Sequence, residues 1–278
     1  MSRLMQTTSA IVGLLLATEA TSIPAALGAD NKTYTVEQVS GTLHERSFTV
    51  DASELSTVTK KTFTISARVS LEVDRMTGIA AIPTGQVPPA GGAAFDLEGI
   101  FDQVAITVVV DNDDTNIPDL SGPGNCYSTA ELTSLLNDNR DQTPPTNGNW
   151  NVWAGMVTCH DLGALGIMWR TTNRDAFAVF DDAFSGADKD EKILRTSAHE
   201  LGHALNLYHD DGDDQCSGSD TGTTIMNQTG NLDTNWGYGW SVASRNHFNN
   251  DPDASMEPGT STAFCACTGS HVCGYNGC

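Results

Sequence analysis

The sequence predicts a mixed α/β (α+β) fold, in which a twisted mixed β-sheet and two helices follow a β-rich N-terminal region. Apolar, β-branched runs such as residues 104–110 indicate buried strands. Apolar positions at helical spacing occupy residues 192–206, and segments rich in Thr, Ser and Val, with few helix signals, fill residues 30–95. With 278 residues, 39% of them hydrophobic, the chain can bury the core of one large domain or two small ones.

The N-terminal region alternates in hydrophobicity at residues 33–39 and 61–69, as half-buried strands do. A stretch rich in Pro and Gly at residues 82–92 then indicates a linker. We therefore expect residues 30–95 to form a propeptide or a small N-terminal domain. This region contains no cysteine, which excludes a latency device that plugs a metal site with a propeptide thiolate.

The next region, residues 96–255, is expected to form the sheet and its helices. After the strand at 104–110, Ser128 and Glu131 match a capping box, which predicts a helix that reaches about Arg140. The remaining predicted elements are strands at residues 151–157, 162–169 and 176–180 and a helix at residues 192–206.

The segment from His199 to His209 is the strongest functional signal. On a helix, His199 and His203 lie one turn apart on the same face, so both imidazoles can bind one Zn²⁺, and Glu200 can act on a water bound to that metal. His209 follows six residues later, so the chain must turn back to bring it to the metal. Three protein ligands and one open position are typical of a catalytic zinc site. The alternative is a buried amphipathic helix that carries two histidines by chance.

A methionine, Met226, follows in the segment Thr224-Ile225-Met226-Asn227, where a methionine turn would pass beneath the metal. Together these residues resemble the metzincin peptidases, whose pattern is HExxHxxGxxH followed by a Met-turn. The resemblance is closest to the reprolysin-like (adamalysin-like) branch, in which an aspartate follows the third histidine, as Asp210 does here. It covers roughly residues 104–248, and residues 240–248 are similar to the start of the branch's C-terminal helix.

Two positions depart from the family pattern. Asn206 stands where the family has glycine, at the point where the chain leaves the helix, usually in a left-handed conformation. Asparagine tolerates that conformation next best after glycine, so we expect the turn to form. Thr224 stands where the branch often has cysteine, so a family disulfide is expected to be missing or rewired.

The resemblance implies a zinc metalloendopeptidase with one catalytic Zn²⁺. In this interpretation His199, His203 and His209 hold the metal, a zinc-activated water attacks the peptide bond, and Glu200 is the general base. Met226 is a structural floor and not a ligand. A protein or peptide substrate would add to an edge strand, expected at residues 162–169. Two alternatives remain: a zincin-like surface-binding or adhesion module without peptidase activity, and a peptidase fragment that is inactive without further domains.

The composition limits the partners. The formal net charge is −21, from 35 acidic and 14 basic residues, and no basic patch is available for nucleic acid or an anionic membrane. Two acidic clusters are candidate Ca²⁺ sites, with solvated loops as the alternative, because neither matches the EF-hand pattern. They are Asp111, Asp113 and Asp114, and Asp210, Asp211, Asp213 and Asp214.

The N-terminus predicts export. Residues 1–29 contain Arg3, an apolar run at 10–17 that is too short to span a membrane, and then small residues, which is typical of a signal peptide of a secreted, extracellular protein. Seven cysteines agree with an oxidising compartment. Four of them crowd a tail at residues 256–278, where we expect a small disulfide module, with a zinc knuckle as the alternative. The odd number of cysteines indicates an unpaired or intermolecular thiol, or a fragment of a longer protein.

Overall fold

The structure is a computed structural model, and it describes residues 32–36, 46–50, 67–121, 126–143, 150–210, 223–228, 234–250 and 256–259. The chain divides into two compact units, Met1–Ile65 and Ser66–Cys278. In the first unit, β1 (Lys32–Val36) pairs antiparallel with β2 (Arg46–Val50), and Tyr34 lies opposite Phe48. This two-stranded sheet agrees with the β-rich region that the sequence predicts.

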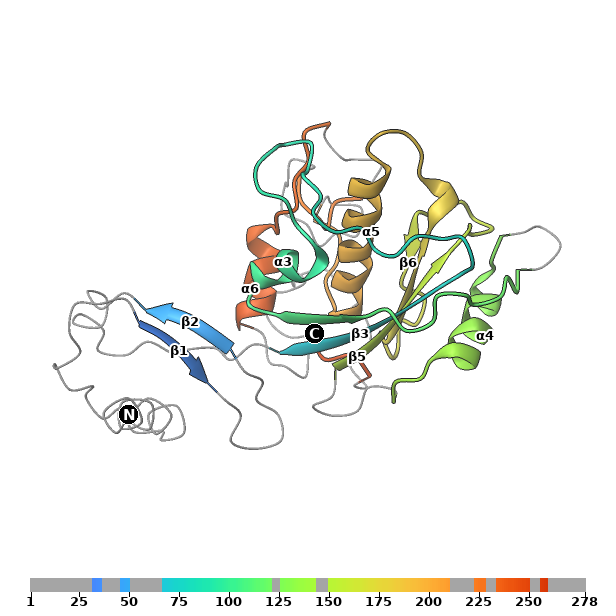
Figure 1. Cartoon of the computed structure of the whole chain (residues 1–278), viewed down its shortest axis with the longest axis horizontal. Helices are drawn as coiled ribbons and strands as arrows, with labels where there is room; N and C mark the ends of the chain where they lie inside the picture. The colour runs from blue at the N-terminus through green and yellow to red at the C-terminus, as the bar shows by residue number, and fades with distance from the viewer. Residues whose placement is uncertain are drawn as a thin grey trace, which may run out of the picture. The chain divides into compact units, whose positions relative to one another are not determined.

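The second unit is built on a five-stranded mixed sheet (Figure 1). Its strands are β3 (Arg68–Arg75), β4 (Thr107–Asp111), β5 (Trp150–Val157), β6 (Gly166–Ile167) and β7 (Ala176–Phe180). The strand order is β4-β3-β5-β7-β6, and all neighbours are parallel except β6, which runs antiparallel to β7 at one edge. Every residue of β5 and β7 is buried, as expected for parallel strands covered on both faces.

Helices cover both faces of this sheet. They are α3 (Leu97–Asp102), α4 (Thr129–Asn139), α5 (Lys189–Ala204) and α6 (Val242–Asn250), with a short 3₁₀ turn at Asp181–Ala183. Alternate residues of a strand point to opposite faces, and β7 follows this rule. Phe177 and Val179 pack in the core with α3, α5 and α6, whereas Ala178 and Phe180 pack in a second core with α4.

The unit that holds the sheet begins about thirty residues earlier than the boundary predicted at residue 96, because β3 is an interior strand of this sheet, between β4 and β5. The last two residues of the strand predicted at 61–69 belong to β3, which continues to Arg75, and residues 61–66 lie outside the described residues. The interior of β3 contains Glu72 and Asp74, both buried. These two acidic residues interrupt the apolar pattern by which a buried strand is predicted, so the rest of β3 was not predicted. Each carboxylate accepts hydrogen bonds that compensate for its burial: Glu72 from two backbone N–H groups and Asp74 from the indole of Trp153.

The stretch predicted to be a linker, residues 82–92, also belongs to this unit. The N–H of Ala90 donates to the carbonyl of Trp236, and Gln86 and Phe95 exchange two backbone hydrogen bonds. The predicted strand at 162–169 is shorter than expected, since only Gly166–Ile167 is paired, and α3 was not predicted at all.

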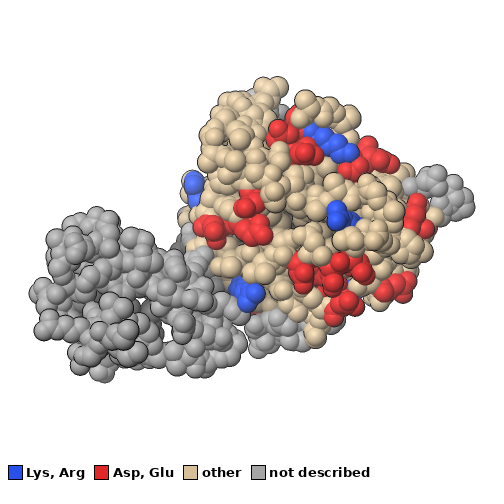
Figure 2. Space-filling view, viewed as in Figure 1, with Lys and Arg blue, Asp and Glu red and all other residues tan. Residues whose placement is uncertain are grey.

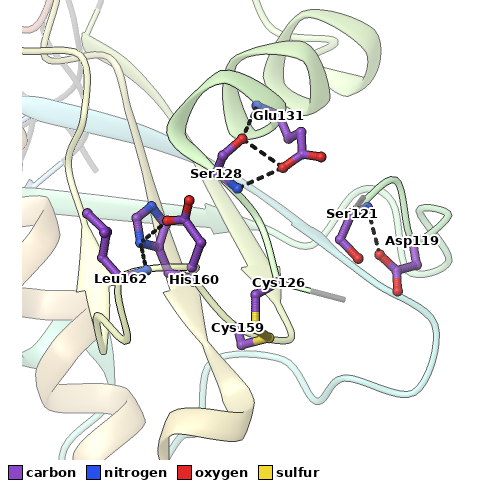
Figure 3. Close-up of a disulfide and its surroundings, with 9 residues drawn as sticks. Asp119, Ser121, Cys126, Ser128, Glu131, Cys159, His160 and Leu162 are labelled. Carbon is purple, nitrogen blue, oxygen red and sulfur yellow. Dashed lines mark hydrogen bonds and ion pairs between the residues drawn. A yellow bond between two sulfur atoms is a disulfide. The ribbon is translucent and has the colours of Figure 1, made fainter. Parts of the chain in front are cut away.

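Other local predictions agree with the structure. The capping box is present at the start of α4: the backbone N–H of Ser128 donates to the Glu131 carboxylate, and the backbone N–H of Glu131 donates to the Ser128 hydroxyl (Figure 3). Close to it, a disulfide joins Cys126 to Cys159, which ties the start of α4 to the end of β5 (Figure 3). The other five cysteines lie outside the described residues. Among the helices that the structure describes, none is long and apolar enough to cross a membrane.

Candidate metal centre

Helix α5 positions the first two histidines and the glutamate. It begins at Lys189, ends at Ala204, and is buried from Ile193 onward because it packs against the sheet. His199 and His203 lie one turn apart, and their rings are nearly perpendicular with centroids 4.6 Å apart. Both side chains are buried at the C-terminal half of the helix.

A left-handed turn returns the chain to bring in the third histidine. Asn206 has φ +69°, the conformation expected for this position, and the N–H of Leu207 donates to the carbonyl of Gly202. The prediction that asparagine makes this turn in place of glycine is confirmed. His209 then lies beside the other two, and its ring stacks on that of His199 with centroids 5.0 Å apart.

The three imidazoles converge through their Nε2 atoms. Nε2 of His199 lies 3.0 Å from that of His203 and 3.1 Å from that of His209, and the distance between His203 and His209 is 3.1 Å. A zinc ion bound tetrahedrally at 2.0–2.1 Å needs its nitrogen ligands about 3.3 Å apart, so this set fits the ion closely.

The hydrogen bonds of the Nδ1 atoms determine that Nε2 is the ring nitrogen that faces the point between the three imidazoles. Nδ1–H of His199 donates to the carbonyl of Ile225 at 2.8 Å, and Nδ1–H of His203 donates to the carbonyl of Leu207 at 2.7 Å. Because a carbonyl can only accept, both Nδ1 atoms carry the proton and both Nε2 lone pairs face the centre. Nδ1 of His209 lies 3.1 Å from the side-chain amide of Gln228. Such outer partners orient metal-binding imidazoles.

Burial keeps the imidazoles in the form that binds metal. Desolvation first, and then neighbouring positive charge, hold the pKa of His199 well below its usual range. The same causes, burial and then His209, lower the pKa of His203 to about 3. Neutral imidazole is the metal ligand, so at ordinary pH these two rings need not lose a proton to bind.

The side chain of Glu200 packs between α5, to which it belongs, and the edge strand β6. Its carboxylate accepts a hydrogen bond from the backbone N–H of Met168, and burial raises the pKa of Glu200 to about 8. A Cβ on Gly166 would lie 2.7 Å from Cγ and 2.8 Å from Oε1 of Glu200, so only glycine lets β6 pass this close to the glutamate. A divalent cation nearby would favour the ionised carboxylate and lower this pKa.

The segment Thr224–Asn227, which we call the Met-turn, underlies the histidines. Met226 is fully buried, and its carbonyl accepts from the N–H of Asp210 at 3.0 Å. The Asp210 carboxylate accepts from the Ser241 hydroxyl at 2.7 Å and lies 2.6 Å from the Thr224 hydroxyl, which stands where the family often has cysteine. Asp210 therefore joins the third histidine to the Met-turn and to the start of α6, as a buried structural residue.

Comparison with known proteins decides the family. The profile of metallo-peptidase family M12, in its reprolysin form, matches residues 94–240, more than half of the chain. The chain belongs to metallo-peptidase family M12. The match begins just before α3, continues past the Met-turn to Trp240, and includes all three histidines and Glu200.

Two further comparisons accompany the family match. No curated protein matches this M12 chain. Among solved structures, it is similar to the crystal structure of a zinc-dependent peptidase from Methanocorpusculum labreanum (strain Z), with 16% sequence identity and a TM-score of 0.40. That similarity covers 64% of this chain and 97% of the other.

The other candidate residues lie apart from this centre. Within the described ranges, the three histidines are the one group of three metal-binding side chains whose ligand atoms lie within 4.8 Å of one another, so Asp111, Asp113 and Asp114 form no such group. Residues Asp211, Asp213 and Asp214 are outside the described residues, as is the tail at 260–278. The face of the M12 protein in Figure 2 carries scattered acidic side chains and few basic ones.

Sequence reasoning missed the residues that support the histidines. Four residues that contact the site were not predicted: Gln228, Met168, Gly166 and Arg195. The first three lie in segments that meet α5 only in the folded chain. Arg195 lies on α5 itself, but arginine is a residue type with no metal chemistry of its own. Helix spacing alone would have placed only Arg195, one turn before His199.

Proposed function

We propose that this M12 metallopeptidase is a secreted zinc endopeptidase that uses Glu200 as its general base. The observation that carries the proposal is the convergence of three Nε2 atoms, within 3.1 Å of one another, beside a buried glutamate. A module that only binds a surface has no use for that carboxylate, because three imidazoles suffice to hold the metal. The signal-like segment at residues 1–29 supports secretion.

The residues divide the work as follows. His199, His203 and His209 would hold Zn²⁺, which supplies Lewis acidity and lowers the pKa of a bound water. Glu200 accepts a proton from the attacking water and passes it to the leaving amine. The N–H of Met168 holds the carboxylate in place during both transfers.

The edge strand supplies the substrate site in this proposal. β6 has β7 on one side, and its other side is the edge of the sheet as far as the structure describes it. An extended peptide can add there through main-chain hydrogen bonds. Gly166 packs directly on Glu200, so a peptide along β6 passes next to the base.

The variant Glu200→Gln tests the proposal. It keeps the size of the side chain but cannot accept a proton, so we expect normal zinc content and a loss of peptide cleavage of about 10²–10⁴-fold or more. A chelator such as phenanthroline should abolish the parent's cleavage, and added zinc should restore it. A folded, zinc-loaded parent that cleaves nothing in a broad peptide library would refute the proposal, as would a fully active Glu200→Gln variant.

A further inference from the structure

Arg195 is a buried cation one helical turn before His199. It lies on α5 with only 2% of its surface exposed, on the side of the helix that packs in the core. Burying a charge is costly unless hydrogen bonds compensate for it, and an apolar side chain would fill such a position at no such cost. An arginine at this position therefore needs hydrogen-bond partners that compensate for the burial of its charge.

Its partners are the carbonyls of the Met-turn. Nη2 of Arg195 donates to the carbonyl of Ile225 at 2.9 Å and to that of Thr224 at 3.3 Å, and it also donates to the carbonyl of Asn227. The guanidinium carbon lies 5.9 Å from the ring centroid of Trp236, within the range of a cation–π contact. One cation thus gathers three carbonyls of a four-residue turn.

One of these carbonyls belongs also to the metal centre. The Ile225 oxygen that accepts from Arg195 accepts from Nδ1–H of His199 at 2.8 Å. The orientation of the His199 ring, and the direction of its Nε2 lone pair, therefore depend on a carbonyl whose place Arg195 sets. Arg195 and His199 are separated by four residues on α5, so both reach the same turn from the same face of the helix.

We propose that Arg195 is a positioning residue for the metal site, which holds the Met-turn so that Ile225 orients His199 for binding. The proposal rests on the zinc site of the proposed function and extends it to a residue outside the ligand set. Arginine suits the role because its planar guanidinium is always charged and presents donors in a fixed geometry, whereas lysine offers a point charge on a flexible stem.

A second buried arginine provides a matched control. Arg174 is fully buried and donates to the carbonyls of Ala204, Met256 and Glu257, which lie at the end of α5 and in the C-terminal segment rather than in the Met-turn. Its removal should cost stability for the same physical reason as removal of Arg195. Only Arg195 should change the affinity for zinc.

The experiment measures zinc affinity of the full chain by competition with a chromophoric chelator. The variants are Arg195→Met, Arg195→Gln, Arg195→Lys and Arg174→Met, and urea unfolding of each metal-free protein reports its stability. We expect Arg195→Met to raise the Kd for zinc by about 10–100-fold, as loss of an outer-shell partner does, and Arg195→Lys to rescue part of this loss. Arg174→Met should unfold at lower urea but keep its Kd within about threefold of the parent.

The outcomes separate this proposal from the proposed function. A Kd within about threefold of the parent in Arg195→Met overturns the role of Arg195, and Arg195→Gln, which also removes the charge, decides in the same way if Arg195→Met does not fold. An equal loss of affinity in Arg174→Met also overturns it, because the effect would then follow from stability alone. A folded parent that binds no zinc overturns both the proposed function and this role, whereas a zinc-dependent parent with unaffected variants overturns only this role.

Discussion

The sulfur of Met226 lies where a side chain on Gly202 would be: a Cβ built there would be 2.6 Å from Sδ. Gly202 sits on α5 one residue before His203, so the absence of a side chain lets the Met-turn approach the helix beneath the three histidines. Real Cβ atoms do not approach sulfur this closely, so the space between α5 and the Met-turn holds either the Met226 sulfur or a side chain at residue 202, but not both.

Gly202→Ala should therefore lower the free energy of unfolding by about 1–3 kcal/mol, because overpacking forces the turn away from the helix. Urea unfolding of the metal-free chain measures this. In the background of Met226→Ala the same change should cost clearly less, since the sulfur is gone. Equal costs in the two backgrounds would show that Gly202 and Met226 are not in contact.

Gln228 should matter through His209. In the structure the amide nitrogen of Gln228 lies 3.1 Å from Nδ1 of His209. If His209 binds the metal through Nε2, its Nδ1 carries a proton, so the Gln228 amide must turn over to present its oxygen as the acceptor. Gln228→Ala should raise the Kd for zinc by about 10–100-fold, whereas Gln228→Glu, which can also accept, should stay closer to the parent. The measurement is chelator competition. A Gln228→Ala variant with parental affinity would remove Gln228 from the support of the site.

The buried carboxyl of Asp74 should make the free energy of unfolding depend on pH. Burial raises the pKa of Asp74 from 3.8 to about 6, although the Trp153 indole and the Asp114 N–H oppose the shift. The native carboxyl thus keeps its proton to a higher pH than the unfolded one, so the unfolding free energy contributed by this group falls as pH rises from about 4 to about 6.

Asp74→Asn mimics the protonated form and should remove this contribution. The difference in unfolding free energy between variant and parent should shift in favour of the variant between pH 4 and 8, by up to about 3 kcal/mol at about 1.4 kcal/mol per pKa unit. Urea unfolding at a series of pH values tests this. A difference between variant and parent that does not change with pH would show that the carboxyl titrates normally.

The position of β3 bears on maturation. The sequence predicted a signal peptide at residues 1–29 and a propeptide or small domain at residues 30–95, but a cut that removed a propeptide ending near residue 95 would separate the interior strand β3 from the other four strands of the sheet. We expect a propeptide cut near the boundary between the two compact units, at Ile65 and Ser66. N-terminal sequencing of secreted, active protein checks this. A mature N-terminus at residues 83–95 would contradict it.

Much of the site followed from local patterns. The spacing of His199 and His203 on one helix face is a property of the helix itself, and asparagine at residue 206 allowed the left-handed turn that the structure contains. The capping box at Ser128 and the strand at residues 176–180 were likewise readable, because a cap and an apolar run depend on neighbours in sequence.

The tertiary structure alone decided what lies next to these elements. β3 was missed because its buried Glu72 and Asp74 are compensated by groups about 70–80 residues away, which no hydrophobicity pattern contains. The contact of Gly166 with Glu200, and the shared carbonyl of Ile225 beneath His199, join residues about 30 positions apart. The sequence by itself determined which three histidines and which glutamate come together: helix periodicity places His199, Glu200 and His203, and the left-handed turn at Asn206 returns His209. The residues that support them arise from packing between segments and became visible only once the chain was folded.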